Sequence, residues 1–259
     1  MIWLLAIQLA IGATEHYEHA KQDLAQQKFS EAASEVDAAL HENPYMVSAL
    51  VLKARLATFA RRPDVAKSCL ITAITVDPTS EEAQFYLGVL FYEQNDFTPA
   101  ISPLEAAQKL SPNSPLPVFY LAMTHQALGD PNKALELYQQ AQNLSPQTSL
   151  QSAEIAVAYG RLLVFLGRTQ DGMEKERRAI GIDPKSRDAH YVLAKGLEYE
   201  GNFENAALEG ELALTLPEAS ASDAEIHFLL TRLYRKLNKP ELAEAHMEKF
   251  LALQKTTQK

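Results

Sequence analysis

Two histidines near the start of the chain have a spacing that suits metal chemistry. His16 and His19 are three residues apart, so a helix would place both imidazoles on one face. Imidazole nitrogen is a common zinc ligand, but a stable site needs at least a third protein ligand. The sequence offers none close to the pair, so we interpret both as solvated histidines and expect no metal site.

No other constellation of catalytic residues is present. The sequence holds no His-Glu-x-x-His zinc motif, no glycine-rich phosphate loop and no nucleophile elbow. Carboxylates are plentiful, but they recur on predicted helix surfaces, and spacing alone does not pair them for acid–base work. The single cysteine, Cys69, excludes an internal disulfide and a cysteine-rich metal site, and its helical position predicts a packed thiol. We therefore expect a non-enzymatic protein without a cofactor.

A fixed period organises the helices that would position these residues. Pro44, Pro78, Pro112 and Pro146 are each 34 residues apart, and Pro184 follows 38 residues later. Small residues keep the same period in three phases. The first contains Ala20, Ala54, Gly88, Ala122, Gly160, Ala194 and Thr231; the second Ala32, Ala66, Ala100, Ala134, Gly172, Ala206 and Ala243; the third Ala39, Ala73, Ala107, Ala141, Ala179 and Ala213, with Phe250 last. Small side chains allow two helices to approach closely, and such a period is typical of a solenoid.

This pattern resembles the tetratricopeptide repeat (TPR) family over roughly residues 13–255. The resemblance implies an all-α, right-handed superhelical solenoid of helix-turn-helix repeats. We count seven repeats, which begin near residues 14, 47, 81, 115, 153, 187 and 224. Four extra residues at 147–152 and three at 219–223 are expected to lengthen a loop or a helix end. The predicted divisions are thus a segment 1–13, a repeat array 14–255 and a polar tail 256–259.

The segment 1–13 reads as a secretory signal peptide. An apolar run from Ile2 to Ile11 precedes Gly12-Ala13, a small-residue cleavage pattern, and the run is too short to span a bilayer. No lysine or arginine lies at its start, and no cysteine near Ala13 suggests a lipid anchor. The alternative is an apolar helix that caps the first repeat. The segment predicts an exported protein, in a bacterial periplasm or secreted, with a cytoplasmic location as the alternative.

Local signals mark several helix ends. Thr79 with Glu82, and Ser222 with Glu225, have the spacing of a capping box. Pro115 and Pro117 are expected in the first turn of a helix, where proline loses no hydrogen bond. A polar final helix over residues 241–253 is expected to close the array.

The second helix of the fifth repeat is unusual. Its residues 174–178 are all charged, and Gly172 and Glu176 replace an alanine and a large apolar residue of the other repeats. We expect this helix to be the most weakly packed. It is either a contact surface on the outer face or a solvated helix.

The first helices of the repeats carry a pattern of their own. Residues four apart share a helix face, and two such phases are apolar in the middle repeats and basic at both ends. The predicted partner-binding groove consists of Tyr17, Lys21, Arg55, Phe85, Val89, Phe119, Met123, Arg161, Tyr191, Lys195, Phe228 and Arg232. Tyr17–Lys21, Tyr191–Lys195 and Phe228–Arg232 could pair as a cation over a ring. In TPR proteins this first-helix face is concave, so the resemblance implies a groove for a peptide with an apolar centre and acidic flanks.

The alternative is that acidic residues neutralise the basic ones. Arg55 could pair with Glu82, Arg161 with Asp188, and Lys195 with Glu225, each from the next repeat. The family's carboxylate clamp for chaperone tails uses asparagines beside basic residues on first helices. The matching phase here has none, so a chaperone-tail receptor is not expected.

These observations predict a protein-binding scaffold that holds peptide segments or partner proteins. A net charge of −9 argues against nucleic-acid binding. A second hypothesis is a structural subunit of a bacterial envelope assembly or secretion complex that binds through its convex face. A third is an accessory module that positions substrates for a separate enzyme. The array contains no segment expected to span a membrane, and the sequence leaves the oligomeric state open.

Overall fold

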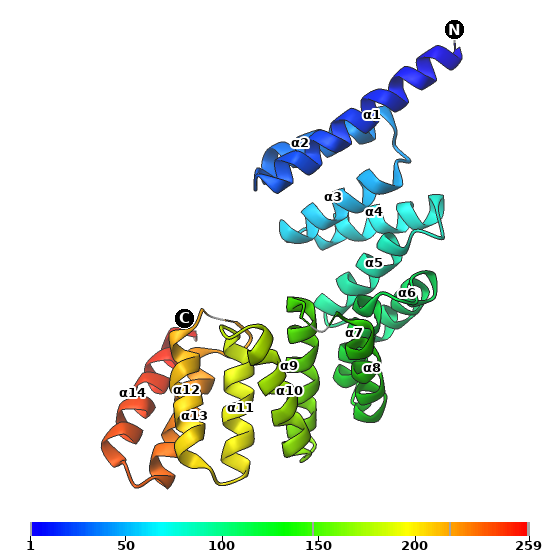
Figure 1. Ribbon diagram of the computed structural model, residues 1–259. Coiled ribbons are helices and arrows are strands. Elements are labelled where there is room, and N and C mark those ends of the chain that lie inside the picture. Colours follow the sequence, from blue (N-terminus) through cyan, green and yellow to red (C-terminus); the bar gives the residue numbers. More distant parts are fainter. Residues whose placement is uncertain (1, 147, 218, 258–259) are drawn as a thin grey trace. The chain divides into compact units, whose positions relative to one another are not determined.

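The structure, a computed structural model, describes the backbone of residues 2–146, 148–217 and 219–257, and side chains from residue 11 to residue 255 within those ranges. All regular elements in these ranges are α-helices (Figure 1). They fall into two compact units, residues 1–130 and 131–259. The first unit contains α1 (Ile2–Ala25), α2 (Phe29–Glu42), α3 (Val47–Phe59), α4 (Pro63–Val76), α5 (Glu81–Glu93), α6 (Phe97–Leu110) and α7 (Pro115–Ala127). The second contains α8 (Pro131–Leu144), α9 (Leu150–Phe165), α10 (Thr169–Ile182), α11 (Arg187–Tyr199), α12 (Phe203–Thr215), α13 (Asp223–Lys236) and α14 (Pro240–Thr257).

Each repeat is a pair of helices joined by one type of turn. The residue at the turn has a left-handed backbone in all seven, at Gln27, Arg61, Asn95, Gly129, Gly167, Gly201 and Asn238. The next amide donates to a carbonyl five residues earlier, as Arg62 N does to Ala57 O and Asp130 N to His125 O. This is the bond that closes a helix end followed by a left-handed residue. All seven repeats therefore share one turn geometry after the first helix.

The small residues lie where helices touch, as predicted. Ala20, Ala54 and Ala122 are buried on first helices, and Ala66 and Ala134 are buried on second helices. At Gly88 a methyl group would meet Leu104 Cγ at 2.4 Å, so the leucine of the second helix already fills that space. The core is therefore a continuous seam between neighbouring helices within each unit.

The two insertions have different structures. The first lengthens α9, which begins at Leu150 with Ser149 as its N-cap and has 16 residues, against 13 in α3, α5 and α11. The second is a loop before α13, and two side chains of α11 hold it. Buried Arg187 donates to Leu216 O at 3.2 Å, and Asp188 accepts from Ala221 N at 2.7 Å.

The expectation that α10 is weakly packed was wrong. Glu176 is fully buried, together with Met173 and Ala179. The helix lies so close to α9 that a methyl group at Gly172 would meet Gly160 O at 2.8 Å. A methyl group at Gly160 would in turn overlap the Glu176 carboxylate. Two glycines thus bring the backbones together, and the charged run 174–178 still has a buried side.

The cap of α5 also differs from the prediction. Ser80, not Thr79, is the N-cap, and its hydroxyl accepts from Ala83 N. Thr79 instead donates its hydroxyl to Asp77 Oδ1 at 2.7 Å. The capping box of Ser222 and Glu225 is present in full, and α7 begins at Pro115 as expected.

The chain ends differ from the predicted divisions in helix length. The helix α1 runs unbroken from Ile2 to Ala25, through the predicted cleavage point after Ala13. The helix α14 continues to Thr257, past the predicted end at residue 253, and residues 258 and 259 of the predicted tail lie outside the described residues. Among the described residues, no helix combines the length and apolar character needed to cross a membrane.

Candidate functional site: the face of the first helices

The first helices carry all twelve predicted groove residues. In the first unit these are Tyr17, Lys21, Arg55, Phe85, Val89, Phe119 and Met123, and in the second Arg161, Tyr191, Lys195, Phe228 and Arg232. Phe85, Val89 and Phe119 are buried at the level of the side chain, whereas Arg55 and Lys21 are exposed. In the first unit these three apolar members therefore lie deep and the two basic members lie at the surface, whereas Phe228 of the second unit is 41% exposed.

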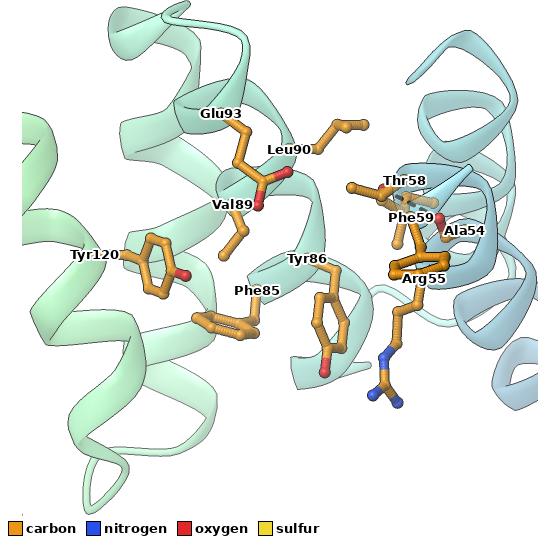
Figure 2. A pocket seen from close by; sticks show the side chains of 11 residues that line it. Ala54, Arg55, Thr58, Phe59, Phe85, Tyr86, Val89, Leu90, Glu93 and Tyr120 are labelled. Atoms are coloured by element: carbon orange, nitrogen blue, oxygen red, sulfur yellow. Dashed lines mark hydrogen bonds between the residues drawn. The ribbon is translucent and has the colours of Figure 1, made fainter. Parts of the chain in front are cut away.

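In the first unit, this face contains a pocket of about 470 Å³ (Figure 2). Its walls come from α3, α5 and α7, and Leu70 of α4 forms part of its apolar floor. Figure 2 shows Tyr120 reaching in from α7 and Arg55 from α3, with side chains of α5 between them. The full lining is Ala54, Arg55, Thr58, Phe59, Leu70, Phe85, Tyr86, Val89, Leu90, Glu93 and Tyr120.

Aromatic rings hold the shape of this pocket. Phe85 packs edge-to-face against Tyr86, with centroids 5.2 Å apart, and against Tyr120 at 5.4 Å. Tyr92 meets Tyr120 at 5.8 Å in the same geometry. Such edge-to-face pairs stabilise beyond their buried area and fix ring orientation. These contacts therefore fix the orientation of the aromatic rings in the pocket wall.

The pocket has one charged group of each sign. The Arg55 guanidinium lies over the Tyr86 ring, 5.0 Å from its centroid, and no ion pair between Arg55 and Glu82 occurs among the described residues. Glu93 lines another part of the wall, and partial burial raises the pKa of its carboxyl. The exposed guanidinium leaves a cation available at the rim.

Sequence reasoning missed Tyr86, Tyr120 and Phe59 of this pocket. Tyr86 and Tyr120 each follow a predicted groove residue, Phe85 and Phe119, by one position. A pocket between repeats is lined by side chains from both edges of a helix face. Its residues therefore come from two adjacent positions of the repeat rather than from one. The shared position of Tyr86 and Tyr120, 34 residues apart, was the available signal.

In the second unit, the same face is basic. Arg161 pairs with Asp188 at 3.5 Å, as the neutralisation alternative proposed, and Arg232 pairs with Glu198 at 2.6 Å, which was not foreseen. An ion pair between Lys195 and Glu225 is not among those of the described side chains. Burial, followed by repulsion from Arg161 and Arg232, lowers the pKa of Lys195. Positive charge is therefore only partly balanced around this lysine.

All three predicted cation–ring pairs are present. Lys21 lies 5.5 Å from the Tyr17 centroid, Lys195 lies 5.5 Å from that of Tyr191, and Arg232 lies 5.4 Å from that of Phe228. Lys21 also pairs with Glu18 of its own helix at 3.0 Å. These contacts orient the cations along the first helices.

Three stretches of the chain match family models of the tetratricopeptide repeat: residues 51–115, 116–148 and 224–257. They cover about half of the chain, and the paired helices and repeated turns extend the same architecture over the rest. The chain belongs to the tetratricopeptide repeat family and has its all-α superhelical fold. No curated protein matches its sequence significantly.

Solved structures share this fold at low sequence identity. A chain of the APC/C hetero-tetramer Cut9-Hcn1 aligns with a TM-score of 0.75 and 17% identity, over 89% of this chain and 45% of that one, so this chain spans less than half of its length. A TPR protein from Parabacteroides merdae aligns with a TM-score of 0.68 and 12% identity, over 93% of both chains. YrrB, described as a TPR protein with an unusual peptide-binding site, aligns with a TM-score of 0.55 and 20% identity, over 71% of this chain and 92% of that one.

Proposed function

We propose that the chain is a non-enzymatic scaffold that binds peptide segments of a partner protein on the face of its first helices. The observation that carries this proposal is the aromatic pocket between α3, α5 and α7. Binding sites are typically concave and apolar, with a few polar groups that fix orientation. The pocket has this composition, and YrrB supports peptide binding as a use of the same fold.

The pocket defines the chemistry of its occupant. Its volume of about 470 Å³ would hold one large apolar or aromatic side chain, which would pack against Phe85, Val89 and Tyr120. The Arg55 guanidinium at the rim would then pair with a carboxylate next to that side chain. We infer a short segment in which a bulky apolar residue lies beside an acidic one.

The basic face of the second unit would bind a further carboxylate of the partner. Lys195 lies between two arginines whose charges are each directed to one carboxylate, Asp188 or Glu198. An incoming carboxylate would relieve the repulsion that lowers the pKa of Lys195. The partner is thus expected to carry acidic residues on the segments that flank its apolar anchor.

A peptide-display selection on the purified chain tests this function. Selected peptides are synthesised with a fluorophore, and their affinity is measured by fluorescence anisotropy. Thr58→Trp, which would fill the pocket from a half-exposed position, is expected to weaken binding at least tenfold. Arg55→Glu should weaken the binding of peptides that contain an acidic residue more than the binding of peptides in which that acidic residue is replaced by glutamine.

Lys109→Glu is the matched control for the charge reversal. Lys109 is exposed on α6, a second helix of the same unit, outside the pocket lining. Peptides that bind all four proteins equally would contradict the proposed site. Circular dichroism of each variant establishes that a loss of binding is not a loss of fold.

A second candidate is an assembly subunit that binds through its second helices. Leu208 on α12 is 67% exposed and Leu212, one turn later, is 42% exposed. The positions equivalent to Leu208 in the first five repeats are Ser34, Ser68, Ser102, Glu136 and Glu174. An exposed leucine pair, with Leu208 at a position that is polar in the first five repeats, suits an apolar stripe on a partner subunit. Leu208→Ser with Leu212→Gln should then abolish co-purification of that subunit while peptide binding persists.

We also propose that residues 1–13 direct export to a periplasm or to the medium. The apolar run before Gly12-Ala13 supports this proposal. A fusion to alkaline phosphatase, active only outside the cytoplasm, tests it, together with the mass of the mature chain. An inactive fusion and an uncleaved chain would favour the cytoplasmic alternative, in which the segment is simply the start of α1.

A further inference from the structure

Metal-ligating side chains gather where α1 and α2 of the first repeat meet. The Nδ1 atoms of His16 and His19 both approach Oε2 of Glu35, at 2.6 Å and 3.9 Å. Each of the three residues offers one ligand atom within 4.8 Å of the others. The expectation that the histidine pair lacks a third ligand was therefore wrong. The ligand comes from the antiparallel neighbour, 16 residues after His19 in the sequence.

The distances suit a bound ion after a small adjustment. Zinc holds nitrogen and oxygen ligands at about 2.0 to 2.2 Å, so two ligands of a tetrahedral ion lie about 3.3 Å apart. The two observed separations, 2.6 Å and 3.9 Å, lie on either side of that value. A rotation of the Glu35 carboxylate that moves Oε2 by less than about 1 Å would lengthen its distance to His16 Nδ1 and shorten its distance to His19 Nδ1.

Repeats six and seven have a contacting pair at the same positions, and a comparison with them shows what is particular to the first repeat. His190 contacts Glu209 at 2.6 Å, and His227 contacts His246 at 2.9 Å, at the same positions of repeats six and seven. There the position of His19 is taken by a buried leucine, Leu193 or Leu230. At repeat seven Glu211 Oε1 also contacts His246 Nε2 at 3.0 Å, but among the described residues only the first repeat places three ligand atoms within 4.8 Å of one another.

The position of His19 also makes the site accessible. Its side chain is 61% exposed, so an ion can reach the three ligands from solvent and keep water in its remaining position. Two imidazoles and one carboxylate favour zinc, nickel or copper over magnesium and calcium, which prefer oxygen ligands.

We propose that His16, His19 and Glu35 bind one divalent transition-metal ion of the zinc class, which cross-links α1 to α2. In the described part of the chain, this helix pair has a neighbouring repeat on one side only, at α3. A repeat with one neighbour gains less from stacking than an internal repeat does. The ion would therefore add a cross-link between these two helices. The site is separate from the peptide pocket.

Calorimetric titration of ZnCl₂ into the untagged full chain, stripped with EDTA and desalted, tests the proposal. One ion per chain is expected to bind, and His19→Gln and Glu35→Gln are each expected to weaken binding at least tenfold. Glu209→Gln is the matched control, because it changes the same position of repeat six where no third ligand exists. Magnesium in millimolar excess should not compete.

Two further readouts decide between ligation and loss of structure. Cobalt added to the parent chain should give the visible absorption of a tetrahedral ion, and His19→Gln should lose it. Zinc should raise the melting temperature of the parent and not that of His19→Gln, whose apo form should melt like the parent because His19 is exposed. Absence of stoichiometric zinc binding, or equal binding by parent and His19→Gln, would overturn the proposal.

Discussion

Replacing Glu176 by glutamine is expected to change how the stability of the second unit depends on pH. The carboxyl is fully buried in the seam between α9 and α10, and neither of its oxygens has a hydrogen-bond partner among the described residues. Burial raises the pKa of Glu176 well above its ordinary value; the charge of Arg161 opposes this shift and that of Asp188 adds to it. The folded state therefore keeps the neutral acid to higher pH than the unfolded chain does.

The sign of the effect follows from the proton count. The unfolded chain loses the Glu176 proton near its ordinary pKa of 4.5, whereas the folded chain keeps it to higher pH. The stability of the parent is fully present below pH 4.5 and falls as the pH rises toward the folded pKa. Each pH unit in this window costs about 1.4 kcal/mol, so from pH 4.5 to pH 7 the loss is at most about 3.5 kcal/mol. Glutamine does not titrate, and Glu176→Gln should lack this slope.

Urea denaturation followed by circular dichroism at several values from pH 4 to pH 7.5 measures the difference between parent and variant. The difference should be constant near pH 4 and should grow in favour of the variant toward neutral pH. Hydrogen exchange localises the effect, since protection of α9 and α10 amides should change most. Any free-energy difference that the buried glutamine amide adds is the same at every pH. This does not affect the test, because the test measures how the difference in unfolding free energy changes with pH.

Glu174→Gln controls for the removal of one negative charge. Glu174 is exposed and lies two residues earlier on the same helix. A difference between parent and Glu176→Gln that stays flat over this pH range would refute the argument that the buried carboxyl folds in its neutral form. An equal slope for Glu174→Gln would assign the effect to net charge instead.

Three further changes test other features of the fold. Ser80→Ala should cost about 1 kcal/mol in urea denaturation, and Thr79→Ala less than half of that, because only Ser80 caps α5. Arg61→Gly should raise stability by roughly 0.5 to 1 kcal/mol, measured in the same way, since Arg61 has a left-handed backbone (φ 55°). Burial lowers the pKa of both His227 and His246, so the stability that is present above pH 6.5 should be lost on acidification. Hydrogen exchange at about pH 7.5 and 5.5 should show this loss as weaker protection of the α13 and α14 amides at the lower pH. The loss of protection should be smaller in His246→Gln.

The period in the sequence was sufficient to predict the helices and their pairing. Helices α3, α5, α7 and α11 begin at the predicted residues 47, 81, 115 and 187. Small residues at a fixed interval can only be explained by close helix contacts, and the same interval placed the turns. The cation–ring pairs were predictable for the same reason, because residues four apart on a helix must be neighbours.

The features that were missed depend on backbone angles or on groups from different helices. Thr79 and Ser80 can both cap a helix, and only the backbone angles decide which does so. Glu176 reads as a solvated charge until Gly160, on the facing helix, leaves room for its carboxylate. Glu35 becomes a neighbour of His16 only when α2 folds back along α1. Residue types and spacing within one helix contain none of this information.

The difference between residues that keep the repeat period and residues that do not indicates where function lies in a repeat protein. A residue that keeps the period is explained by packing, because every repeat needs the same seam. His19 and Leu208 depart from that pattern: His19 replaces a residue that is a leucine in four other repeats, and Leu208 is exposed where the first five repeats have serine or glutamate. Tyr120 keeps the period with Tyr86, but both line a pocket rather than filling a core. An exposed leucine or an open aromatic pocket stabilises the isolated chain less than the same group buried would. Its benefit is therefore expected from a ligand or partner, and these three places are where binding should be sought first.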